Sequence, residues 1–321
     1  MVVVVWLLAG LVLVGLAVLA ALLVFGTAEV GPPRAGLGVD TGLEGLDYSE
    51  LPELRFCPAR DGQQIPYRLY PAEAEKTVIL IHGSSGRGRS LHGLAEHLAE
   101  ARVARCVAPD MRGHGWGRPG DLDYPGQLEH DLADLIEHLA REGLAKRLIV
   151  LGFSSGGGFA IRFAGSRYGE EASAYVFLAP FVGADSPTLR PDNGWAFPQP
   201  GRILALRILN ALGLTCFNRL TTLSFAIDPA DRPVTTPDYS YRMMLGFAPK
   251  PDYRGNLKRI ARPGVLIIGS EDQDFRPEAY PEDVIAHAGD LRFRVLDGLK
   301  HMDLITRDEA FRAIGEEIAR L

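Results

Sequence analysis

A serine with a glycine two positions away on each side is the first feature of this sequence that could carry chemistry. The segment Gly152-Phe153-Ser154-Ser155-Gly156 follows the apolar run Leu148 to Leu151 and precedes the apolar positions Phe159 to Ile161. In a tight turn from a strand into a helix, a Cβ at either flanking position would clash, so both must be glycine. A glycine-rich helix start without chemistry is the alternative, and the strand and helix patterns on either side disfavour it. We predict that Ser154 is a nucleophile.

A serine hydroxyl is a poor nucleophile at neutral pH, so it needs a base within hydrogen-bond reach and a third group that orients the base. His301 lies in the loop that follows the apolar run Phe293 to Leu296, and we predict that His301 is this base. Other histidines lie on helical patterns, where a solvated surface position is expected: His92, His97, His130 and His138.

The orienting acid is sought after another apolar run. Asp272 follows Val265 to Ile268, again at the end of a predicted strand, and we predict that Asp272 is the acid. Its neighbours Asp274 and Glu271 are the alternatives. Asp303 is only two residues from the predicted base, so its short side chain would not reach the imidazole Nδ1.

Acyl transfer also requires donors for the negative charge that develops on the carbonyl oxygen, and loss of one donor raises the barrier by about 2.7–4 kcal/mol. We predict that the backbone N–H of Ser155, at the start of the helix after the nucleophile, is one donor. The loop His82-Gly83-Ser84-Ser85-Gly86 follows the apolar run Val78 to Ile81, and we assign the second donor to the backbone N–H of Ser84. A structural role in this turn is expected for His82.

Short, mostly continuous apolar runs recur along the chain, as expected for strands covered on both faces. These predicted strands are Val78 to Ile81, Cys106 to Ala108, Leu148 to Leu151, Tyr175 to Leu178, Val265 to Ile268 and Phe293 to Leu296. Helical periods lie between several of them, at Leu91 to Leu98, Leu128 to Leu139 and Phe311 to Leu321. Before them, Leu54 to Cys57 and Pro66 to Tyr70 flank an Asp61-Gly62 turn, which predicts an antiparallel hairpin. The alternation predicts a mostly parallel sheet with helices on both faces and a site at the carboxyl ends of its strands.

One segment departs from this alternation. Residues 184–257 contain nine prolines and an apolar, helix-like run from Ile203 to Leu214, with little that resembles a core strand. Prolines at this density interrupt regular elements. We predict that the segment is an inserted cap, which divides the catalytic core into residues 51–183 and 258–321.

The N-terminal segment has a different character. Val2 to Phe25 is an apolar run without a charged residue, and at about 1.5 Å rise per residue it is long enough to cross a bilayer. We predict a transmembrane helix or signal-anchor over residues 1–26. A cleaved signal peptide is the alternative, because Gly26 to Ala28 offers small residues for cleavage. The run is longer than the usual apolar stretch of about 7–15 residues, and no Lys or Arg precedes it, which favours the anchor.

A linker over residues 27–50, rich in Gly and Pro, is predicted between this helix and the core. We therefore expect the protein to be a single-pass membrane protein with an N-terminal anchor. The first positive charge, Arg34, lies after the helix, but large domains cross membranes despite such a bias. The side of the membrane that the core faces is left open, and so is the oligomeric state.

The composition excludes several other classes of function. A net charge of −6 supplies no basic surface for a phosphate backbone, so nucleic-acid binding is not expected. The three cysteines, Cys57, Cys106 and Cys216, are far apart and odd in number, which indicates free thiols rather than a metal or redox cluster, with Cys106 in a strand. The predicted chemistry needs no metal and no organic cofactor.

Five motifs, taken in order, resemble the monoacylglycerol lipase and lysophospholipase-like branch of the α/β-hydrolases. They are His82 to Gly86, Asp110 to Gly115, Gly152 to Gly156, Gly269 to Asp272 and Gly298 to His301. The resemblance covers most of Leu54 to Leu321, is weakest in the cap and does not include the N-terminal helix. It implies an α/β-hydrolase fold, in which the nucleophile, acid and base match Ser154, Asp272 and His301 in the order typical of that fold. It also implies a packing role for His114, in a structural turn.

Together these residues predict hydrolysis of a carboxylic ester through an acyl-enzyme. The apolar cap and the membrane helix favour lipid esters of the monoacylglycerol or lysophospholipid type as substrates. Short soluble esters, amides and peptides remain alternatives, because the cap carries no motif for a particular acyl or alcohol group.

Two alternatives belong to other classes. Residues 83–90 are one residue from a phosphate-binding P-loop, but Arg89 stands where that loop needs lysine. The other alternative is a non-catalytic, membrane-tethered binding module that keeps the fold. Neither alternative explains why a serine, an acid and a base all follow predicted strands.

Overall fold

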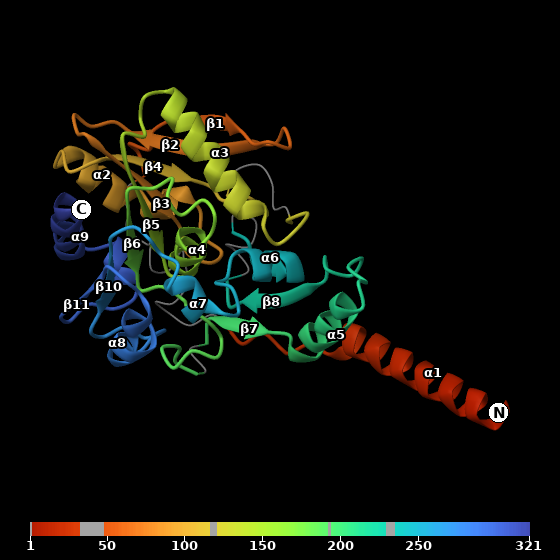
Figure 1. Cartoon of the computed structure of the whole chain (residues 1–321). Coiled ribbons are helices and arrows are strands. Elements are labelled where there is room, and N and C mark those ends of the chain that lie inside the picture. Colours follow the sequence, from red (N-terminus) through yellow and green to blue (C-terminus); the bar gives the residue numbers. More distant parts are fainter. Residues whose placement is uncertain (1, 33–47, 116–120, 192–193, 229–234) are drawn as a thin grey trace.

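The computed structural model describes residues 2–32, 48–115, 121–191, 194–228 and 235–321, and these form an α/β body, a cap and a protruding helix (Figure 1). Most of the predicted linker, residues 33–47, lies outside the described residues. The helix α1 (Val2–Phe25) extends away from the body, so the N-terminus is remote from the rest of the chain. The C-terminus lies on the body, beside its last helix.

The body contains a sheet of eight strands in the order β1-β2-β4-β3-β5-β6-β10-β11. The strands are β1 (Leu54–Pro58), β2 (Gln64–Tyr70), β3 (Lys76–Ile81), β4 (Arg105–Pro109), β5 (Arg147–Phe153), β6 (Ala174–Leu178), β10 (Gly264–Gly269) and β11 (Leu291–Leu296). β1 and β2 pair antiparallel, as do β2 and β4, whereas the pairs from β4 to β11 are parallel. Every apolar run predicted as a strand lies within one of these strands, and the hairpin is confirmed as β1 and β2.

The strands at the centre of the sheet form the core of the body. Every residue of β6 and β10 is buried, as is every residue of β5 after Arg147. Strands covered on both faces must be apolar throughout, which explains why their sequences do not alternate. At the edge of the sheet, β11 has a lower degree of burial, and Val295 is exposed.

Helices cover both faces of the sheet. They are α2 (His92–Glu100), α3 (Gln127–Arg141), α4 (Ser155–Ala164), α8 (Tyr280–Asp283) and α9 (Asp308–Arg320). Short 3-10 helices lie at Gly88–Leu91, Pro277–Ala279, Ile285–His287 and Met302–Ile305. α2 packs against α9, and an ion pair between Glu129 and Arg162 joins α3 to α4 on the other face. The helices predicted from periodicity are therefore confirmed as α2, α3 and α9.

One histidine was wrongly expected to be on the surface. His92 is only 3% exposed, and its Nδ1 lies 3.1 Å from the hydroxyl of Tyr70 on β2. His92 is the first residue of α2, and its position relative to the sheet depends on packing between elements rather than on helical periodicity.

The predicted cap lies between β6 and β10 and has a structure of its own. It contains β7 (Ala196–Pro198), α5 (Pro200–Ala211), β8 (Thr221–Phe225), β9 (Asp238–Ser240), α6 (Tyr241–Gly246) and α7 (Tyr253–Leu257). The three strands form a small antiparallel sheet, separate from the main sheet, which the sequence pattern did not predict. α5 overlaps most of the apolar run predicted from Ile203 to Leu214, but it begins earlier, at Pro200, and ends at Ala211. At the end of this segment, α7 packs on α4 of the body, where the Asn256 side chain donates to the carbonyl of Ile161.

The N-terminal helix α1 packs on the cap, at α5. α1 contains no buried residue, and it is long and apolar enough to cross a membrane. Its last turn packs on the start of α5, where the Arg202 N–H donates to the Gly26 carbonyl over 3.0 Å and the Arg202 Nε donates to the Leu23 carbonyl over 2.9 Å. A Cβ on Gly26 would lie only 2.8 Å from the carbonyl carbon of Gly201, so the close approach of the two backbones requires glycine.

Candidate active site

The turn between β5 and α4 holds Ser154 in a strained backbone conformation. Ser154 has φ 55° and ψ −119°, a combination that costs a non-glycine residue about 1–3 kcal/mol. Three backbone hydrogen bonds hold it there: the Ser154 N–H donates to the Leu178 carbonyl (2.9 Å), and the Ser154 carbonyl accepts from the N–H groups of Gly158 (3.0 Å) and Phe181 (3.0 Å). A Cβ on Gly152 would lie 2.2 Å from the carbonyl oxygen of Gly156, which explains one of the two flanking glycines.

His301 and Asp272 form a buried pair beside this turn. His301 follows β11, Asp272 follows β10, and His301 Nδ1 lies 2.7 Å from Asp272 Oδ2. The other oxygen of Asp272 accepts hydrogen bonds from the backbone N–H groups of Asp274 (2.9 Å) and Phe275 (2.8 Å). The structure thus brings the predicted base and the predicted acid together, with Nδ1–H donating to a carboxylate whose position is fixed by two amides. Of the other carboxylates, Glu271 is exposed.

Asp303 turns away from His301, as its position in the sequence predicts. Its Oδ2 accepts from the backbone N–H of Lys300 over 2.8 Å, and its Oδ1 lies 3.2 Å from Arg307 Nε. Asp303 is therefore engaged locally and does not compete with Asp272.

The surroundings of His301 favour its charged form. Burial lowers the pKa of His301, but the negative charges of Asp272 and Asp274, with the hydrogen bond to Asp272, raise the pKa to about 9. The rings of Phe153 and Phe275 pack against the imidazole and exclude water from it. The imidazole is thus held in one orientation between uncharged rings and two carboxylates.

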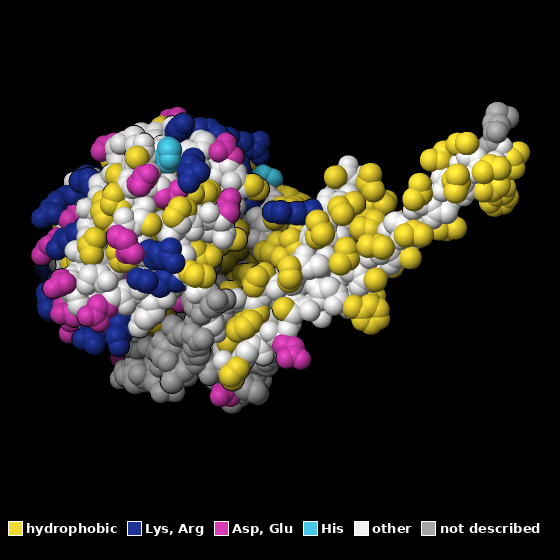
Figure 2. Space-filling view, turned by 90° about the horizontal axis from the view of Figure 1, so that it is seen from below, with side chains coloured by type: hydrophobic (Ala, Val, Ile, Leu, Met, Phe, Trp, Pro, Cys, Tyr) yellow, Lys and Arg dark blue, Asp and Glu magenta, His cyan; other side chains and the backbone are white. Residues whose placement is uncertain are grey.

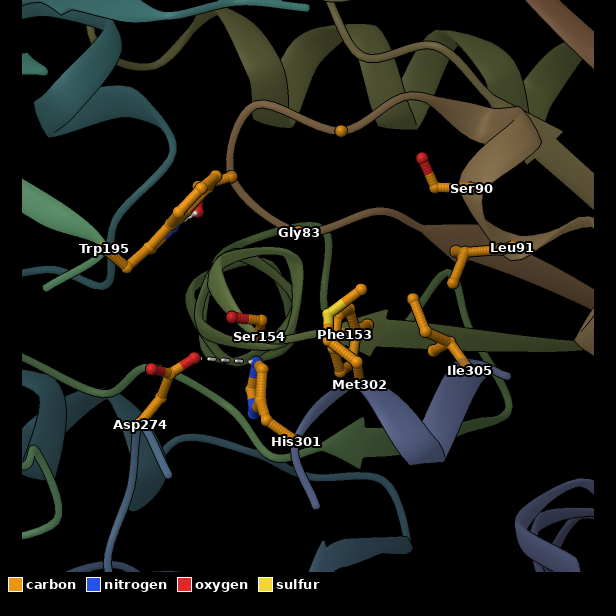
Figure 3. Close-up of a pocket in the computed structure, with 12 residues that line it drawn as sticks. Gly83, Ser90, Leu91, Phe153, Ser154, Trp195, Asp274, His301, Met302 and Ile305 are labelled. Atoms are coloured by element: carbon orange, nitrogen blue, oxygen red, sulfur yellow. Dashed lines mark hydrogen bonds and ion pairs between the residues drawn. The ribbon is translucent and has the colours of Figure 1, made fainter. Parts of the chain in front are cut away.

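Asp274 lies on the opposite side of the imidazole from Asp272. Its Oδ2 is 3.6 Å from His301 Nε2, the nitrogen that faces the pocket (Figure 3). Ser154, Asp274 and His301 all line this pocket, a cavity of about 30 Å³. The Ser154 hydroxyl and His301 Nε2 are not joined by a hydrogen bond in this structure. Nε2 therefore interacts with the Asp274 carboxylate and not with the Ser154 hydroxyl.

Of the two residues whose amides are predicted as oxyanion donors, Ser84 lines this pocket and Ser155 directly follows Ser154, which lines it. Ser155 is the first residue of α4, where backbone N–H groups have no acceptor within the helix. Ser84 lines the pocket, and a Cβ on the preceding Gly83 would be only 3.3 Å from the Ser154 Cβ, so the loop is in contact with the nucleophile. Within the described part of the chain, neither amide donates to a protein acceptor. Both amides are therefore available to a ligand beside Ser154.

His82 supports the loop that carries Ser84. Its Nδ1 donates to the Gly83 carbonyl over 2.8 Å, and its Nε2 accepts from the backbone N–H of Met111 over 3.2 Å. This bonding pattern requires the neutral ring, and burial lowers the pKa of His82 accordingly. His82 thus has the structural position that the sequence predicted.

Residues of the cap contact the loop that carries Ser84, and the sequence did not predict these contacts. The Tyr239 hydroxyl accepts from the Ser85 N–H over 3.0 Å and donates to His114 Nε2 over 2.6 Å. The Trp195 Nε1–H donates to Ser84 Oγ over 2.9 Å. His114 is buried and packs in this cluster, as the resemblance implied. Tyr239 and Trp195 carry no motif, because their role depends on contacts with residues more than 100 positions away.

The described residues contain no cluster of three or more His, Cys, Asp or Glu side chains that could hold a metal ion. Cys57 and Cys106 are buried, and Cys216 is exposed, all as free thiols. Arg89, the residue that a P-loop would place on a phosphate, instead lies over the Tyr48 ring at 5.0 Å from its centroid. The geometry therefore does not favour the P-loop alternative.

Curated proteins with related sequences are hydrolases. The chain is 33% identical over 124 residues to Lipase LipV of Mycobacterium tuberculosis, and the match covers 38% of this chain and 43% of that protein. It is 32% identical over 100 residues to Serine hydrolase BPHL of Homo sapiens, covering 31% of this chain and 34% of that protein. The matches thus span less than half of the length of these relatives.

Solved structures show the same fold over most of the chain. A soluble variant of monoglyceride lipase from Saccharomyces cerevisiae has a TM-score of 0.63 at 20% identity, covering 86% of this chain and 96% of that one. A thermophilic esterase from Thermogutta terrifontis has a TM-score of 0.59 at 20% identity, covering 84% and 98%. In addition, residues 78–314 match the family described as the alpha/beta hydrolase family. Since this range spans most of the chain and includes every predicted site residue, the chain belongs to the alpha/beta hydrolase family.

Proposed function

We propose that the protein hydrolyses carboxylic esters through an acyl-enzyme, with Ser154 as nucleophile. The observation that carries this proposal is the pocket that Ser154 and His301 line together, with Asp272 on the far side of the imidazole. A nucleophile, a base and an orienting acid in this order are the groups that acyl transfer requires.

In the first half of the reaction, Ser154 Oγ attacks the ester carbonyl carbon and His301 Nε2 takes the hydroxyl proton. Asp272 stabilises the imidazolium through the Nδ1–H bond and keeps Nε2 directed at the pocket. The amides of Ser84 and Ser155 bind the resulting oxyanion. The tetrahedral intermediate then collapses, the bond to the alcohol oxygen breaks, and Nε2–H protonates that oxygen as the alcohol leaves.

In the second half, water attacks the acyl-enzyme. His301 Nε2 now takes a proton from the water, and the same two amides bind the second oxyanion. Collapse releases the carboxylic acid, and Ser154 regains its proton from His301. The cycle consumes one ester and one water and needs no redox partner.

We further propose that the substrates are lipid esters of the monoacylglycerol or lysophospholipid type and that α1 anchors the protein in the membrane. Hydrophobic side chains follow α1 and continue onto the adjoining part of the cap, whereas charged side chains are concentrated on the α/β body (Figure 2). Large apolar side chains exposed on and after α5 are Leu204, Ile208, Leu212, Leu214 and Phe217. Because α1 ends on α5, an anchor in the bilayer would hold this apolar face at the membrane surface, where lipid esters are found.

The pocket of this structure is small and partly open to solvent. A cavity of about 30 Å³ has room for little more than water, so an acyl chain needs the cap to move. Trp195 is a cap residue that lines the pocket, and its Nε1–H donates to the Ser84 side chain rather than to the backbone of the Ser154 turn. Opening of the cap is therefore part of the proposed function.

Labelling of the full chain with a fluorophosphonate tests the proposal. We expect the wild type and Ser155→Ala to be labelled, because Ser155 contributes only its backbone amide, and Ser154→Ala to be unlabelled. On a fluorogenic ester, Ser154→Ala should lose activity by about 10⁴-fold or more. Labelling at another serine, or wild-type turnover in Ser154→Ala, would exclude the mechanism.

A series of esters with increasing acyl length separates the substrate classes. Lipid esters in vesicles should give kcat/KM values that rise with acyl length. A steady fall with length would favour short soluble esters instead, and a folded wild type that takes no fluorophosphonate label would favour the non-catalytic binding module.

A further inference from the structure

The carboxylate of Asp274 occupies a position that the proposed mechanism does not use. Asp272 already holds Nδ1 of His301, whereas Asp274 lies at the pocket side of the ring, with Oδ2 3.6 Å from Nε2 (Figure 3). Ser154 lines the same pocket. Asp274 is thus a second acid beside the base, on the side from which a substrate approaches.

The backbone around Asp274 holds the side chain in this position. The Asp274 N–H donates to Asp272 Oδ1 over 2.9 Å, and the Asp274 carbonyl accepts from the Arg190 N–H over 3.0 Å. The Arg190 Nε also donates to the Phe275 carbonyl over 2.9 Å. With its amide and its carbonyl both bound, Asp274 is preorganised and does not depend on a substrate to order it.

One oxygen of Asp274 lacks a hydrogen-bond donor. Asp274 is only 7% exposed, and its Oδ1 is buried without a partner in the described part of the chain. A buried carboxylate oxygen that accepts no hydrogen bond lowers the stability of the fold by about 1–3 kcal/mol or more. Such atoms are therefore rare unless a ligand or a water molecule donates a hydrogen bond to them. Burial accordingly raises the pKa of Asp274, the charge of His301 lowers it, and the charge of Asp272 raises it further.

The place of Asp274 relative to Nε2 identifies the part of the substrate that it meets. In the proposed reaction, Nε2–H delivers its proton to the oxygen of the departing alcohol. A group beside Nε2 therefore lies next to the alcohol part of the ester rather than next to its acyl chain. A carboxylate there accepts hydrogen bonds from hydroxyl groups and repels phosphate.

We propose that Asp274 is a leaving-group subsite that selects esters of neutral polyols, by accepting a hydrogen bond from a free hydroxyl, over esters whose alcohol part carries a phosphate. The inference rests on the proposed ester hydrolysis and narrows it. Of the two lipid classes proposed above, it favours monoacylglycerols and disfavours lysophospholipids.

The test compares three esters of one acyl chain, presented in the same mixed micelles to the full chain. They are the glycerol monoester, the propyl ester, which lacks both free hydroxyls, and lysophosphatidic acid, which adds a phosphate. A hydrogen bond to a charged acceptor is worth about 10-fold or more in kcat/KM, so the wild type should prefer the glycerol ester to the propyl ester by about that factor. It should hydrolyse the phosphate-bearing ester least.

Two substitutions separate the acceptor from the charge. Asp274→Leu should bring the ratio of glycerol to propyl ester close to one, because the acceptor is gone. Asp274→Asn keeps an acceptor oxygen and should retain part of that ratio, while its discrimination against lysophosphatidic acid falls. The neighbouring, exposed carboxylate supplies a matched control, Glu271→Gln, which should leave both ratios unchanged.

A role for Asp274 in positioning His301 alone would change all three esters by the same factor. Equal losses on all three esters, or unchanged ratios in both Asp274 variants, would overturn the inference. If Asp274→Leu does not fold, the Asp274→Asn ratios decide the question, because that change preserves shape. Failure of the ester-hydrolase proposal looks different, since the wild type would then hydrolyse none of the esters and take no fluorophosphonate label.

Discussion

The body and the cap contribute to the same pocket in different ways. The body supplies Ser154, Asp272 and His301 from loops that directly follow strands. Hydrogen bonds within or between these loops hold the Ser154 backbone, the Asp272 carboxylate and the His301 ring. The cap supplies Trp195 and Tyr239, whose side chains form hydrogen bonds with the loop that carries Ser84. The groups proposed to do chemistry are thus positioned by rigid, local geometry. The cap residues Trp195 and Tyr239 are positioned instead by the packing of the cap on the body.

This difference suggests a division of roles. Reacting atoms must be held within a fraction of an ångström, which strand ends in a packed sheet can do. A cover must open for a substrate, and contacts made by few side chains can break and form again.

The largest effect is expected from the pH dependence of the body. Because the pKa of His301 is about 9, the base is protonated at neutral pH, and kcat/KM should rise about tenfold per pH unit before it levels off near pH 9. Asp272 and Asp274 are the charged groups that face the imidazole. Asp274→Asn removes a charge that raises the pKa of His301, so its profile should level off at a lower pH. A pH profile that is the same in wild type and Asp274→Asn would show that Asp274 does not act on the base.

The same pKa has a consequence for stability. The folded-state pKa of His301 lies above its ordinary value of 6.5, so the stabilisation is complete below about pH 6.5 and is lost as the pH rises through about 9. Thermal unfolding followed from pH 6 to pH 10 should therefore show a falling Tm, with a smaller fall in His301→Gln.

An intermediate effect is expected where the cap meets the body. Tyr239→Phe removes the hydroxyl that accepts from the Ser85 N–H and donates to His114, and it leaves a buried donor and a buried acceptor unpaired. We expect a loss of about 1–3 kcal/mol in unfolding free energy, with kcat reduced more than KM is raised because the Ser84 loop shifts. Urea unfolding and steady-state kinetics measure the two effects.

The neighbouring cap tyrosine provides the control for this change. Tyr241→Phe alters a buried tyrosine of α6 whose hydroxyl interacts with Arg207 of α5 rather than with the Ser84 loop, and it should leave kcat near the wild-type value. Equal kcat values for the two variants would show that the cap contact does not position the loop.

The smallest effect is expected at the outer surface of the cap. Replacing the exposed Leu204 and Leu212 together by Asn removes apolar area from the face that adjoins α1. Hydrolysis of a lipid ester in vesicles should fall several-fold, whereas hydrolysis of a soluble ester should not change, because neither residue reaches the pocket. Equal changes on both substrates would argue against contact of this face with the membrane.

Much of the body could be predicted from the sequence because its strands are covered on both faces. Apolar runs such as Val78 to Ile81 and Val265 to Ile268 are visible without alignment, and the polar residues that follow them must gather at one edge of a parallel sheet. His301 and Asp272 were found in this way. His92 was misplaced, because periodicity says which residues share a face of a helix but not how far its first residue is enclosed by neighbouring elements.

The small sheet of the cap, by contrast, could not be predicted. β7 and β9 have only three residues each, too short for a periodic pattern, and their pairing is made with β8 across intervening segments. Asp274 shows the same limit within the body. Sequence spacing placed it near His301 only as an alternative to Asp272, and it could not show that the two carboxylates lie on opposite sides of one imidazole.

The sequence by itself determined the elements whose causes are local. Gly152 and Gly156 indicate the tight turn that holds Ser154, and the apolar runs indicate buried strands. The composition of Val2 to Phe25 indicates a helix without a polar face. Only the tertiary structure decided which side of His301 each carboxylate occupies, which cap residues touch the Ser84 loop and that α1 ends on α5. The reason is that these contacts join segments distant along the chain, and their energies depend on distances and directions that no local pattern of residues encodes.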